Sequence, residues 1–358
     1  MKIGILTFHW GTNYGGVLQA YALQTFLEDK GFEVYIINYK PATYEKSILK
    51  CFKTPRFWLW PRLLHEYIKE NRISKFRKEY FNLSILYDSI IELKKNPPIY
   101  DVYIAGSDQI WNPSFTTGGE GQFTSSYFLD FGSKKVKRIG YAISFGCEVY
   151  PKDALNFAEK YIENFNAISV RENSGIKIVE SLGYNNPFVM PDPTLLLTSK
   201  RYNQLLNNKV SNNSSKYVFS YFLRGEDKVV KKAKSYIKKS YSVHNPDKFF
   251  NPHSIEDWIR EIKNSCFVIT NSFHGMVFSI IYHKPFIVFP ANDKYARSND
   301  RFYTLLQELN LEKRIMDKFD TKELCNLIEE RVDWELIDEK ISHLRSQAFS
   351  FLKKSIKE

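Results

Sequence analysis

The chain opens with KIGILTF (residues 2–8), GTNYGG (11–16), VLQAYALQTFLE (17–28) and EVYIINY (33–39). The first and last segments are short apolar runs, which predict strands. The third has apolar residues at helical spacing and stops before Gly31, which predicts a helix. A strand, a helix and a strand in this order form a βαβ unit, so we predict a parallel sheet.

The same alternation continues along the chain. Further strands are predicted at 101–105, 138–144, 167–170, 187–190, 217–223, 266–270 and 286–289, with a helix at 275–283. The polar stretch 198–216 is the expected boundary between two domains, 1–197 and 198–358. The second domain should end in a helix, 335–358, that packs back on the body. We therefore predict an α/β chain of two doubly wound Rossmann-like domains, with ligands at the carboxyl ends of the strands and in the cleft between the domains.

Composition limits the class of protein. The net charge of +11 suits nucleic acid, an anionic membrane surface or anionic substrates. No helix-turn-helix, zinc or RNA-recognition signature is present, so nucleic acid is not expected as a partner. The four cysteines stand singly and the histidines lack metal-ligand spacing, so we expect no disulfide framework and no metal site. No secretory signal opens the chain and no stretch predicts a transmembrane helix. The singly placed cysteines fit a reducing cytosol, so we expect a cytoplasmic protein.

The block 46–78 is basic and aromatic. It carries ten Lys or Arg residues, interleaved with Phe52, Phe57, Trp58, Leu59, Trp60, Leu63 and Leu64. Such a block can rest on anionic lipid. The interpretation that we favour is a partly solvated helical hairpin in which a few apolar residues anchor the core and Lys and Arg side chains reach solvent.

Three segments lie where predicted strands end. In Gly11–Gly16, glycines let the backbone approach a ligand at a helix N-terminus, although a tight turn can be glycine-rich without a ligand. The segment 106–113 (GSDQIWNP) places hydrogen-bonding side chains beside a Trp, which suits a sugar platform or a capped loop. Its candidate residues are Ser107, Asp108, Gln109, Trp111 and Asn112, and those of the first segment are Asn13, Tyr14, Gly15 and Gly16.

The third segment, 270–275 (TNSFHG), follows an apolar strand and opens an apolar helix. His274 there can donate to an anion or pass a proton near neutral pH. Arg171 and Arg224 each end a predicted strand, where a guanidinium group can bind a carboxylate or a phosphate or only form a salt bridge. Arg297 and Arg301 lie in a polar loop, and Asp192, between two prolines, can be a turn residue.

In this order, the segments resemble the polysaccharide pyruvyltransferase family. The matching stretches are GTNYGGVLQAYALQ (11–24), GSDQIWNP (106–113), YAISFG (141–146), SVREN (169–173), PDPTLLL (191–197) and TNSFHGMVFSI (270–280). The resemblance implies a two-domain fold like that of GT-B glycosyltransferases. It also implies phosphoenolpyruvate as the donor substrate, no cofactor, and a cell-surface glycan precursor as acceptor. In bacteria that precursor is often lipid-linked and assembled at the inner face of the membrane, which the block 46–78 would suit.

The resemblance also assigns roles. His274 matches a His of the family's donor site and Arg171 matches an upstream Arg, so both are candidate catalytic residues. The first domain would hold the acceptor and the second the donor. Some members have an Arg two residues before the His, where this chain has Ser272 beside Phe273. The missing positive charge would then come from Arg301, Arg297 or Arg224.

Three other functions fit parts of the pattern. A glycosyltransferase that uses a nucleotide sugar has the same fold class, because fold does not determine function. A glycan-binding protein without catalysis would tolerate Ser272. A membrane-surface adaptor would act through 46–78 alone.

Overall fold

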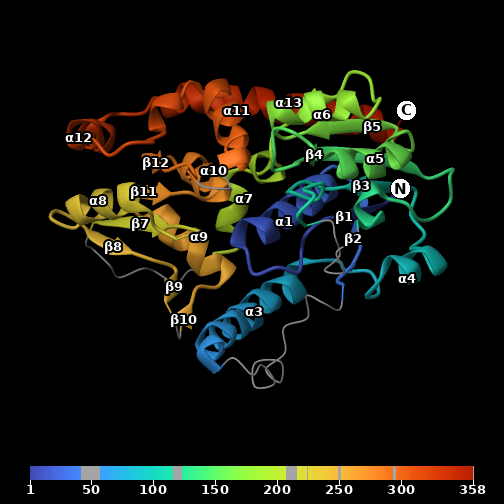
Figure 1. The fold of residues 1–358 in the computed structure, drawn as a ribbon, viewed down its shortest axis with the longest axis horizontal. Coiled ribbons are helices and arrows are strands. Elements are labelled where there is room, and N and C mark those ends of the chain that lie inside the picture. The colour runs from blue at the N-terminus through green and yellow to red at the C-terminus, as the bar shows by residue number, and fades with distance from the viewer. Residues whose placement is uncertain are drawn as a thin grey trace.

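The computed structural model describes residues 1–41, 57–115, 123–206, 216–223, 225–248, 251–292 and 296–357. Two α/β halves lie side by side, each built on a parallel sheet (Figure 1). The predicted alternation of strands and helices is confirmed, with most strand ends within one or two residues of the predicted ones. Arg224 lies outside the described residues, as does 46–56 of the basic block.

The first half contains a six-stranded parallel sheet in the order β2-β1-β3-β4-β5-β6. Its strands are β1 (Lys2–Leu6), β2 (Glu33–Ile36), β3 (Val102–Ala105), β4 (Lys137–Ile143), β5 (Ala167–Val170) and β6 (Phe188–Val189). Its helices are α1 (Tyr14–Glu28), α3 (Trp60–Tyr80), α4 (Ile90–Lys95), α5 (Lys152–Ile162) and α6 (Asn173–Ser181), with 3-10 turns at Phe57–Leu59, Ser126–Phe128 and Pro193–Leu196. The central strands are buried on both faces, which explains why their sequences are continuous apolar runs.

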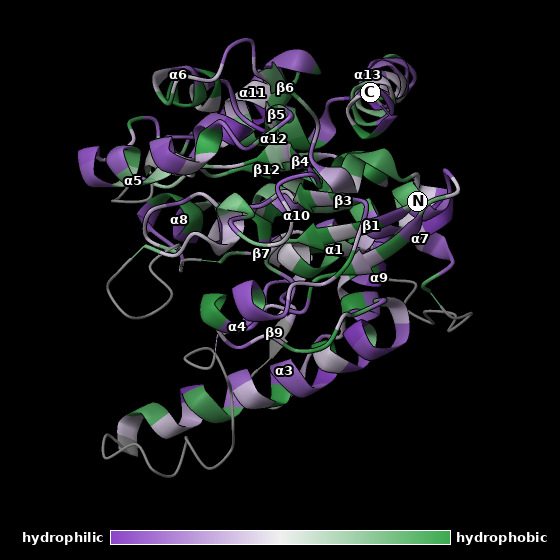
Figure 2. Cartoon of the chain, turned by 90° about the vertical axis from the view of Figure 1, so that its right-hand side faces the viewer, coloured by the Kyte–Doolittle hydropathy of each residue, from purple (hydrophilic) through white to green (hydrophobic). Residues whose placement is uncertain are grey.

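The second half contains a four-stranded parallel sheet in the order β12-β11-β7-β8. Its strands are β7 (Tyr217–Tyr221), β8 (Ser242–His244), β11 (Phe267–Thr270) and β12 (Phe286–Val288); β9 (Asp247–Lys248) and β10 (Asn251–Pro252) form a separate antiparallel pair. Its helices are α7 (Ser199–Asn203), α8 (Lys228–Ile237), α9 (Ile255–Asn264), α10 (Phe273–Ile281), α11 (Asp300–Glu308), α12 (Thr321–Glu329) and α13 (Trp334–Lys357). Figure 2 shows apolar strands in the interior and a largely polar α3 at the bottom, whereas Tyr14–Leu27 of α1 and all of α10 are buried.

The C-terminal helix returns to the first half. In Figure 1, α13 runs along the top of the molecule and ends beside the first sheet. Arg345 donates to the carbonyl oxygens of Leu195 and Leu197, at 2.6 and 2.9 Å, and the Phe351 ring contacts Tyr141. The last helix follows the second sheet in sequence but stabilises the first sheet in space.

The block 57–80 is one long helix preceded by a 3-10 turn. It projects below both sheets in Figures 1 and 2. Ile73 and Phe76 are buried against the body, whereas Trp58 and Trp60 are exposed. Among the described residues, no helix combines the length and apolar composition that crossing a bilayer requires.

Candidate active site

The carboxyl ends of strands from both halves meet at one cavity of about 290 Å³. It is bounded by the loops after β1, β3 and β11 and by the start of α11. Its lining residues are Phe8, Trp10, Gly11, Asn13, Gly16, Asp108, Gln109, Phe115, Leu223, Ser272, Phe273, His274 and Arg301. The structure therefore brings together residues from all three segments singled out in the sequence.

The first βα turn places α1 against His274. The Asn13 side chain accepts a hydrogen bond from the Gly15 amide at 3.0 Å and caps the helix. A Cβ atom on Gly15 would lie 2.1 Å from Cγ and Nδ1 of His274, so only glycine allows this approach. A Cβ atom on Gly16 would lie 3.2 Å from Asp108 Oδ2. The glycines of this turn thus let α1 pack against the imidazole.

His274 occupies the first turn of α10. Ser272 is the N-cap of this helix, and its hydroxyl accepts a hydrogen bond from the Gly275 amide at 3.2 Å. The Ser272 amide donates to Thr270 Oγ1, which in turn donates to the Tyr221 carbonyl oxygen. Ser272, the position at which the resemblance implies an Arg in some members, therefore serves here to begin the helix. His274 is 4% exposed and lines the cavity.

Asp192 is the buried partner of His274. Its Oδ2 lies 3.4 Å from His274 Nε2 and accepts a hydrogen bond from Arg171 Nη1 at 2.7 Å. Thr194 donates both its amide and its hydroxyl to Oδ1, and the Ser107 hydroxyl donates to Oδ2. Burial by itself would raise the pKa of Asp192, but the charges of His274 and Arg171 and the donated hydrogen bonds hold that pKa well below its usual range. Asp192 is therefore an ionised carboxylate fixed against the imidazole.

Arg171 is enclosed by carboxylates. Beyond Asp192, its guanidinium group lies 3.7 Å from Asp108 Oδ1 and 3.8 Å from Glu172 Oε2, and its side chain is 1% exposed. Burial lowers the pKa of Arg171, but these three carboxylates more than compensate and raise it. Arg171 lines a second cavity, of about 370 Å³, instead of the cavity that His274 lines.

Phe273 lines both cavities. The Arg171 and Arg301 guanidinium groups lie over its ring, with Cζ 4.8 and 5.6 Å from the ring centroid. Arg301 lies in the first turn of α11 and lines the His274 cavity. Among the described residues that line the His274 cavity, Arg301 is thus the cation, and it comes from the second half.

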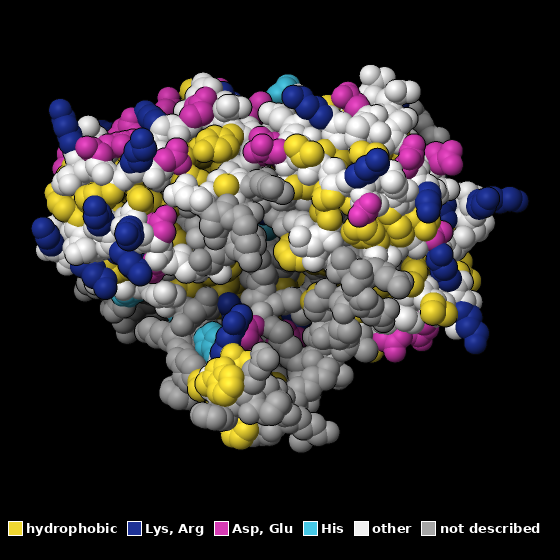
Figure 3. All heavy atoms as spheres, viewed as in Figure 1, with side chains coloured by type: hydrophobic (Ala, Val, Ile, Leu, Met, Phe, Trp, Pro, Cys, Tyr) yellow, Lys and Arg dark blue, Asp and Glu magenta, His cyan; other side chains and the backbone are white. Residues whose placement is uncertain are grey.

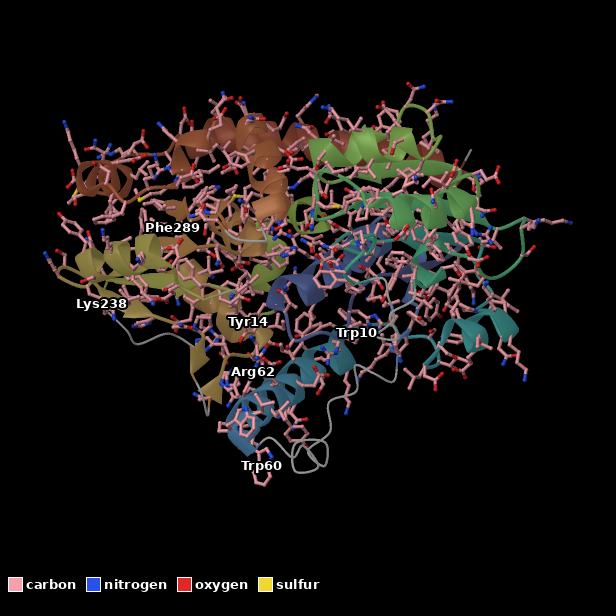
Figure 4. All side chains as sticks on the ribbon, viewed as in Figure 1. Trp10, Tyr14, Trp60, Arg62, Lys238 and Phe289 are labelled. Carbon is pink, nitrogen blue, oxygen red and sulfur yellow. The ribbon has the colours of Figure 1, made fainter. Side chains whose placement is uncertain are left out.

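Other predicted residues have different surroundings. Trp111 is fully buried, stacks on Phe128 with 4.9 Å between ring centroids and donates from Nε1 to the Tyr127 carbonyl oxygen, so it is part of the core. Tyr14 stacks on Trp258 of the second half and lies between the halves in Figure 4.

Within 106–113, Asp108 adopts a positive φ of 75°, and it and Gln109 line the cavity. Asn112 donates to Gln109 Oε1 at 2.9 Å, and so supports that residue instead of lining the cavity. The backbone of Arg297 lies in a 3-10 turn, Ala296–Ser298.

An aromatic wall was missing from the sequence-based expectations. Phe8 and Trp10 follow β1, and their ring centroids are 6.0 Å apart in an edge-to-face arrangement. Phe115 adds a third ring, 6.2 Å from Phe8. Trp10 lies beside the upper end of α3 in Figure 4. The signal was the run TFHW at 7–10, at the carboxyl end of the first strand, where side chains of parallel sheets face a ligand.

Comparison with solved structures identifies the fold. An α-glucosyltransferase in complex with UDP matches over 98% of this chain and 95% of its own, with a TM-score of 0.51 and 9% identity. A UDP-N-acetylglucosamine 2-epimerase from Rickettsia bellii matches over 99% and 97%, with a TM-score of 0.50 and 9% identity. The predicted GT-B-like fold, with two Rossmann-like domains, is thereby confirmed.

Comparison of sequences identifies the family. No curated protein matches the chain. The family profile described as polysaccharide pyruvyl transferase matches residues 13–293, which include the first βα turn, Asp192 and the His274 segment. This match covers well over half of the 358 residues. The chain therefore belongs to the polysaccharide pyruvyl transferase family.

Proposed function

We propose that this chain transfers the pyruvyl group of phosphoenolpyruvate to two hydroxyls of one sugar in a surface-glycan precursor, forming a cyclic ketal. The observation that carries the proposal is the position of His274: its imidazole lines a cavity between the two halves and has an ionised, buried Asp192 behind it. A carboxylate in that position orients an imidazole and stabilises its protonated form.

The donor would bind on the side of the second half. Phosphoenolpyruvate carries a carboxylate and a phosphate, so its site needs fixed positive charge and N–H donors. Arg301 and the N-terminus of α10, next to His274, supply these in the cavity. Arg301 then takes the role left open by Ser272, whose hydroxyl is engaged in the helix cap.

The acceptor would bind on the side of the first half. Phe8, Trp10 and Phe115 offer aromatic faces, against which the C–H face of a sugar ring packs. Asn13, Asp108 and Gln109 line the same cavity and can hydrogen-bond sugar hydroxyls.

The reaction exchanges phosphate for two sugar oxygens. One hydroxyl oxygen bonds to C2 of phosphoenolpyruvate while C3 gains a proton and becomes a methyl group. The C2–O bond to phosphate then breaks, and a second hydroxyl of the same sugar closes the ring on C2. Of the two hydroxyl protons, one balances the proton gained at C3 and the other leaves with phosphate. His274 is the group placed to deliver the proton or to hold the phosphate as imidazolium.

Arg171 has a supporting role in this proposal. The direct donor contact expected from the sequence would place an anion beside a guanidinium group that three carboxylates already surround. Like-charge repulsion from those carboxylates disfavours such a contact. Arg171 instead holds Asp192 in place at 2.7 Å, and Asp192 holds His274.

The test is phosphate release from phosphoenolpyruvate against acceptors that contain galactose, glucose or mannose, with mass spectrometry of the products. The expected product is heavier than the acceptor by one pyruvate minus one water, and His274→Ala should abolish it while leaving the fold intact. The proposal would be overturned if a nucleotide sugar stabilised the protein and was turned over while phosphoenolpyruvate did neither. That result would favour a glycosyltransferase. Acceptor binding without phosphate release would favour a glycan-binding protein.

A further inference from the structure

Asp108 lies just beyond β3, at the carboxyl end of a central strand of the first sheet. Acidic side chains on the face shown in Figure 3 lie mainly at its outer parts, among Lys and Arg. Asp108 instead lines the cavity between the halves, and it is the one carboxylate among the described residues of that lining. His274 lines the same cavity from the second half. The described lining thus combines a carboxylate with an imidazole, two kinds of side chain that exchange protons with substrates.

The backbone of Asp108 is held in an unusual conformation. Its φ of 75° lies in the left-handed region, which Asp and Asn tolerate better than most residues other than Gly. Its carbonyl oxygen accepts hydrogen bonds from the amides of Ile110 and Ser144, at 2.8 and 3.0 Å. Backbone strain persists where the surrounding structure enforces it, and it is concentrated at functional sites. The loop after β3 therefore presents the Asp108 side chain in a fixed direction.

The Asp108 carboxylate is oriented, but its oxygens still have lone pairs to offer. Arg171 Nη2 lies 3.7 Å from Oδ1, and a Cβ atom on Gly16 would lie 3.2 Å from Oδ2. Neither oxygen accepts a hydrogen bond from a described residue, and the side chain is 17% exposed. The Asp192 carboxylate, by contrast, accepts four hydrogen bonds and is fully buried. Asp108 is therefore the carboxylate that can accept a hydrogen bond from a ligand in the cavity.

The Asp108 carboxylate and the His274 imidazole lie against the same turn of α1. The imidazole packs on Gly15, and Oδ2 of Asp108 lies beside the next residue, Gly16. Arg171 also connects the two groups, because it donates to the carboxylate behind His274 and faces Asp108. One helix turn and one buried guanidinium group thus fix both groups relative to each other. A substrate in the cavity would meet a proton donor and a proton acceptor in a fixed arrangement.

We propose that Asp108 is the general base that accepts the proton of the attacking sugar hydroxyl. This assignment rests on the proposed function and adds a second catalytic residue to it. In the first step, the hydroxyl proton passes to the Asp108 carboxylate and the hydroxyl oxygen bonds to C2 of phosphoenolpyruvate. The electron pair of the C2–C3 double bond takes a proton from the His274 imidazolium. In the second step, the C2–O bond to phosphate breaks and the proton on Asp108 leaves with phosphate. The second hydroxyl closes the ring on C2, and its proton restores the imidazolium.

The test separates the carboxylate from the backbone conformation. Asn tolerates the same φ but carries no charge that takes up a proton, so Asp108→Asn should fold and lower kcat about 100-fold or more, with KM for phosphoenolpyruvate unchanged. Asp108→Gly also adopts this φ and removes the side chain. Formate should restore part of its activity, because this small carboxylate can occupy the vacated space and accept the proton. The matched control is Asp153→Asn, an exposed position in α5, which should keep the wild-type rate. Urea unfolding checks that each variant folds.

Three outcomes would overturn the assignment. A wild-type kcat in Asp108→Asn, with activity lost only in Asp108→Ala, would leave Asp108 a role in loop conformation alone. A raised KM for the acceptor with kcat unchanged, and no effect of formate, would make Asp108 an acceptor-binding residue. If the wild type releases no phosphate from phosphoenolpyruvate with any acceptor, the proposed function and the general base fall together. Failure of the general base alone is recognised because the wild type then still turns over.

Discussion

Replacing Gly15 tests the arrangement of the active site most directly. In Gly15→Ala, the new methyl group would lie 2.1 Å from Cγ and Nδ1 of His274. Ordinary contact begins at 3.4 Å, so the imidazole and the start of α1 would have to separate by about 1.3 Å. Neither side moves freely, because Asn13 caps α1 and Asp192 lies behind the imidazole.

The expected effect can be estimated from this displacement. Overpacking of a filled site costs about 1–3 kcal/mol of stability. A reacting group displaced by about 1 Å loses roughly 100-fold in rate, or about 2.7 kcal/mol in the activation free energy. We expect Gly15→Ala to lower kcat/KM by at least roughly this factor and to remain folded.

The assay compares three alanine variants of one turn by phosphate release and by urea unfolding. A methyl group on Gly11 meets no atom within 4 Å, and one on Gly16 meets Asp108 at 3.2 Å. The loss of activity should therefore increase in the order Gly11→Ala, Gly16→Ala, Gly15→Ala. Adding His274→Gly to Gly15→Ala removes both the imidazole and the Cβ atom of residue 274, which lies 2.4 Å from the new methyl group, and should restore part of the stability but not activity. Wild-type kcat/KM in Gly15→Ala would refute the assignment of His274.

Other perturbations test other groups. Asp192→Asn should lower kcat/KM by about 100-fold or more and change the pH–rate profile, since it removes the charge beside His274; an unchanged profile would contradict that role. Arg301→Gln should raise KM for phosphoenolpyruvate roughly tenfold while Arg301→Lys restores part of it; an equal rise in KM for the acceptor would argue against donor binding. Burial lowers the pKa of His9 to about 4. Below about pH 6.5, His9 therefore takes up a proton in the unfolded chain but not in the folded chain, which takes it up only near pH 4. The free energy of unfolding should be highest above pH 6.5 and should fall by up to about 3 kcal/mol as the pH decreases toward 4. Urea unfolding at several pH values checks this, and an equally steep loss in His9→Gln would contradict it. Asp300→Ala removes the hydrogen bond from the Ser174 amide, 2.7 Å long, that joins α11 to α6, and should lower stability by about 1 kcal/mol in the same assay.

Most of the fold could be predicted because its signals are local. An apolar run such as 167–170 can be recognised in isolation, and β5 has those bounds. Short strands at the rim carry too few residues for a period to be visible, so β8, β9 and β10 were not predicted. The predicted start of the helix at 275 was late by two residues, because Ser272 provides the cap that begins α10 at Phe273.

The site was only partly predictable. Residues directly after strands could be identified, since strand ends converge in a parallel sheet, and His274, Asn13 and Asp108 do meet. Trp111 has the same sequence signal, but tertiary packing places its ring in the core. The role of Asp192 could not be read from a turn between two prolines, because its partners lie 21 and 82 positions away, at Arg171 and His274.

The sequence by itself determined the two parallel sheets, the family and the segments that carry the chemistry, because these depend on periodicity and on short motifs. Only the tertiary structure decided which side chains are neighbours. In the folded chain the Gly15 backbone packs against the His274 imidazole, and the Asp192 carboxylate lies behind that ring. Arg171 lies among three carboxylates, whereas Arg301 lines the cavity. The physical reason is that burial and the charge of distant neighbours control what a titratable or cationic group can do. A side chain becomes buried, and distant charges come close to it, only when the chain folds.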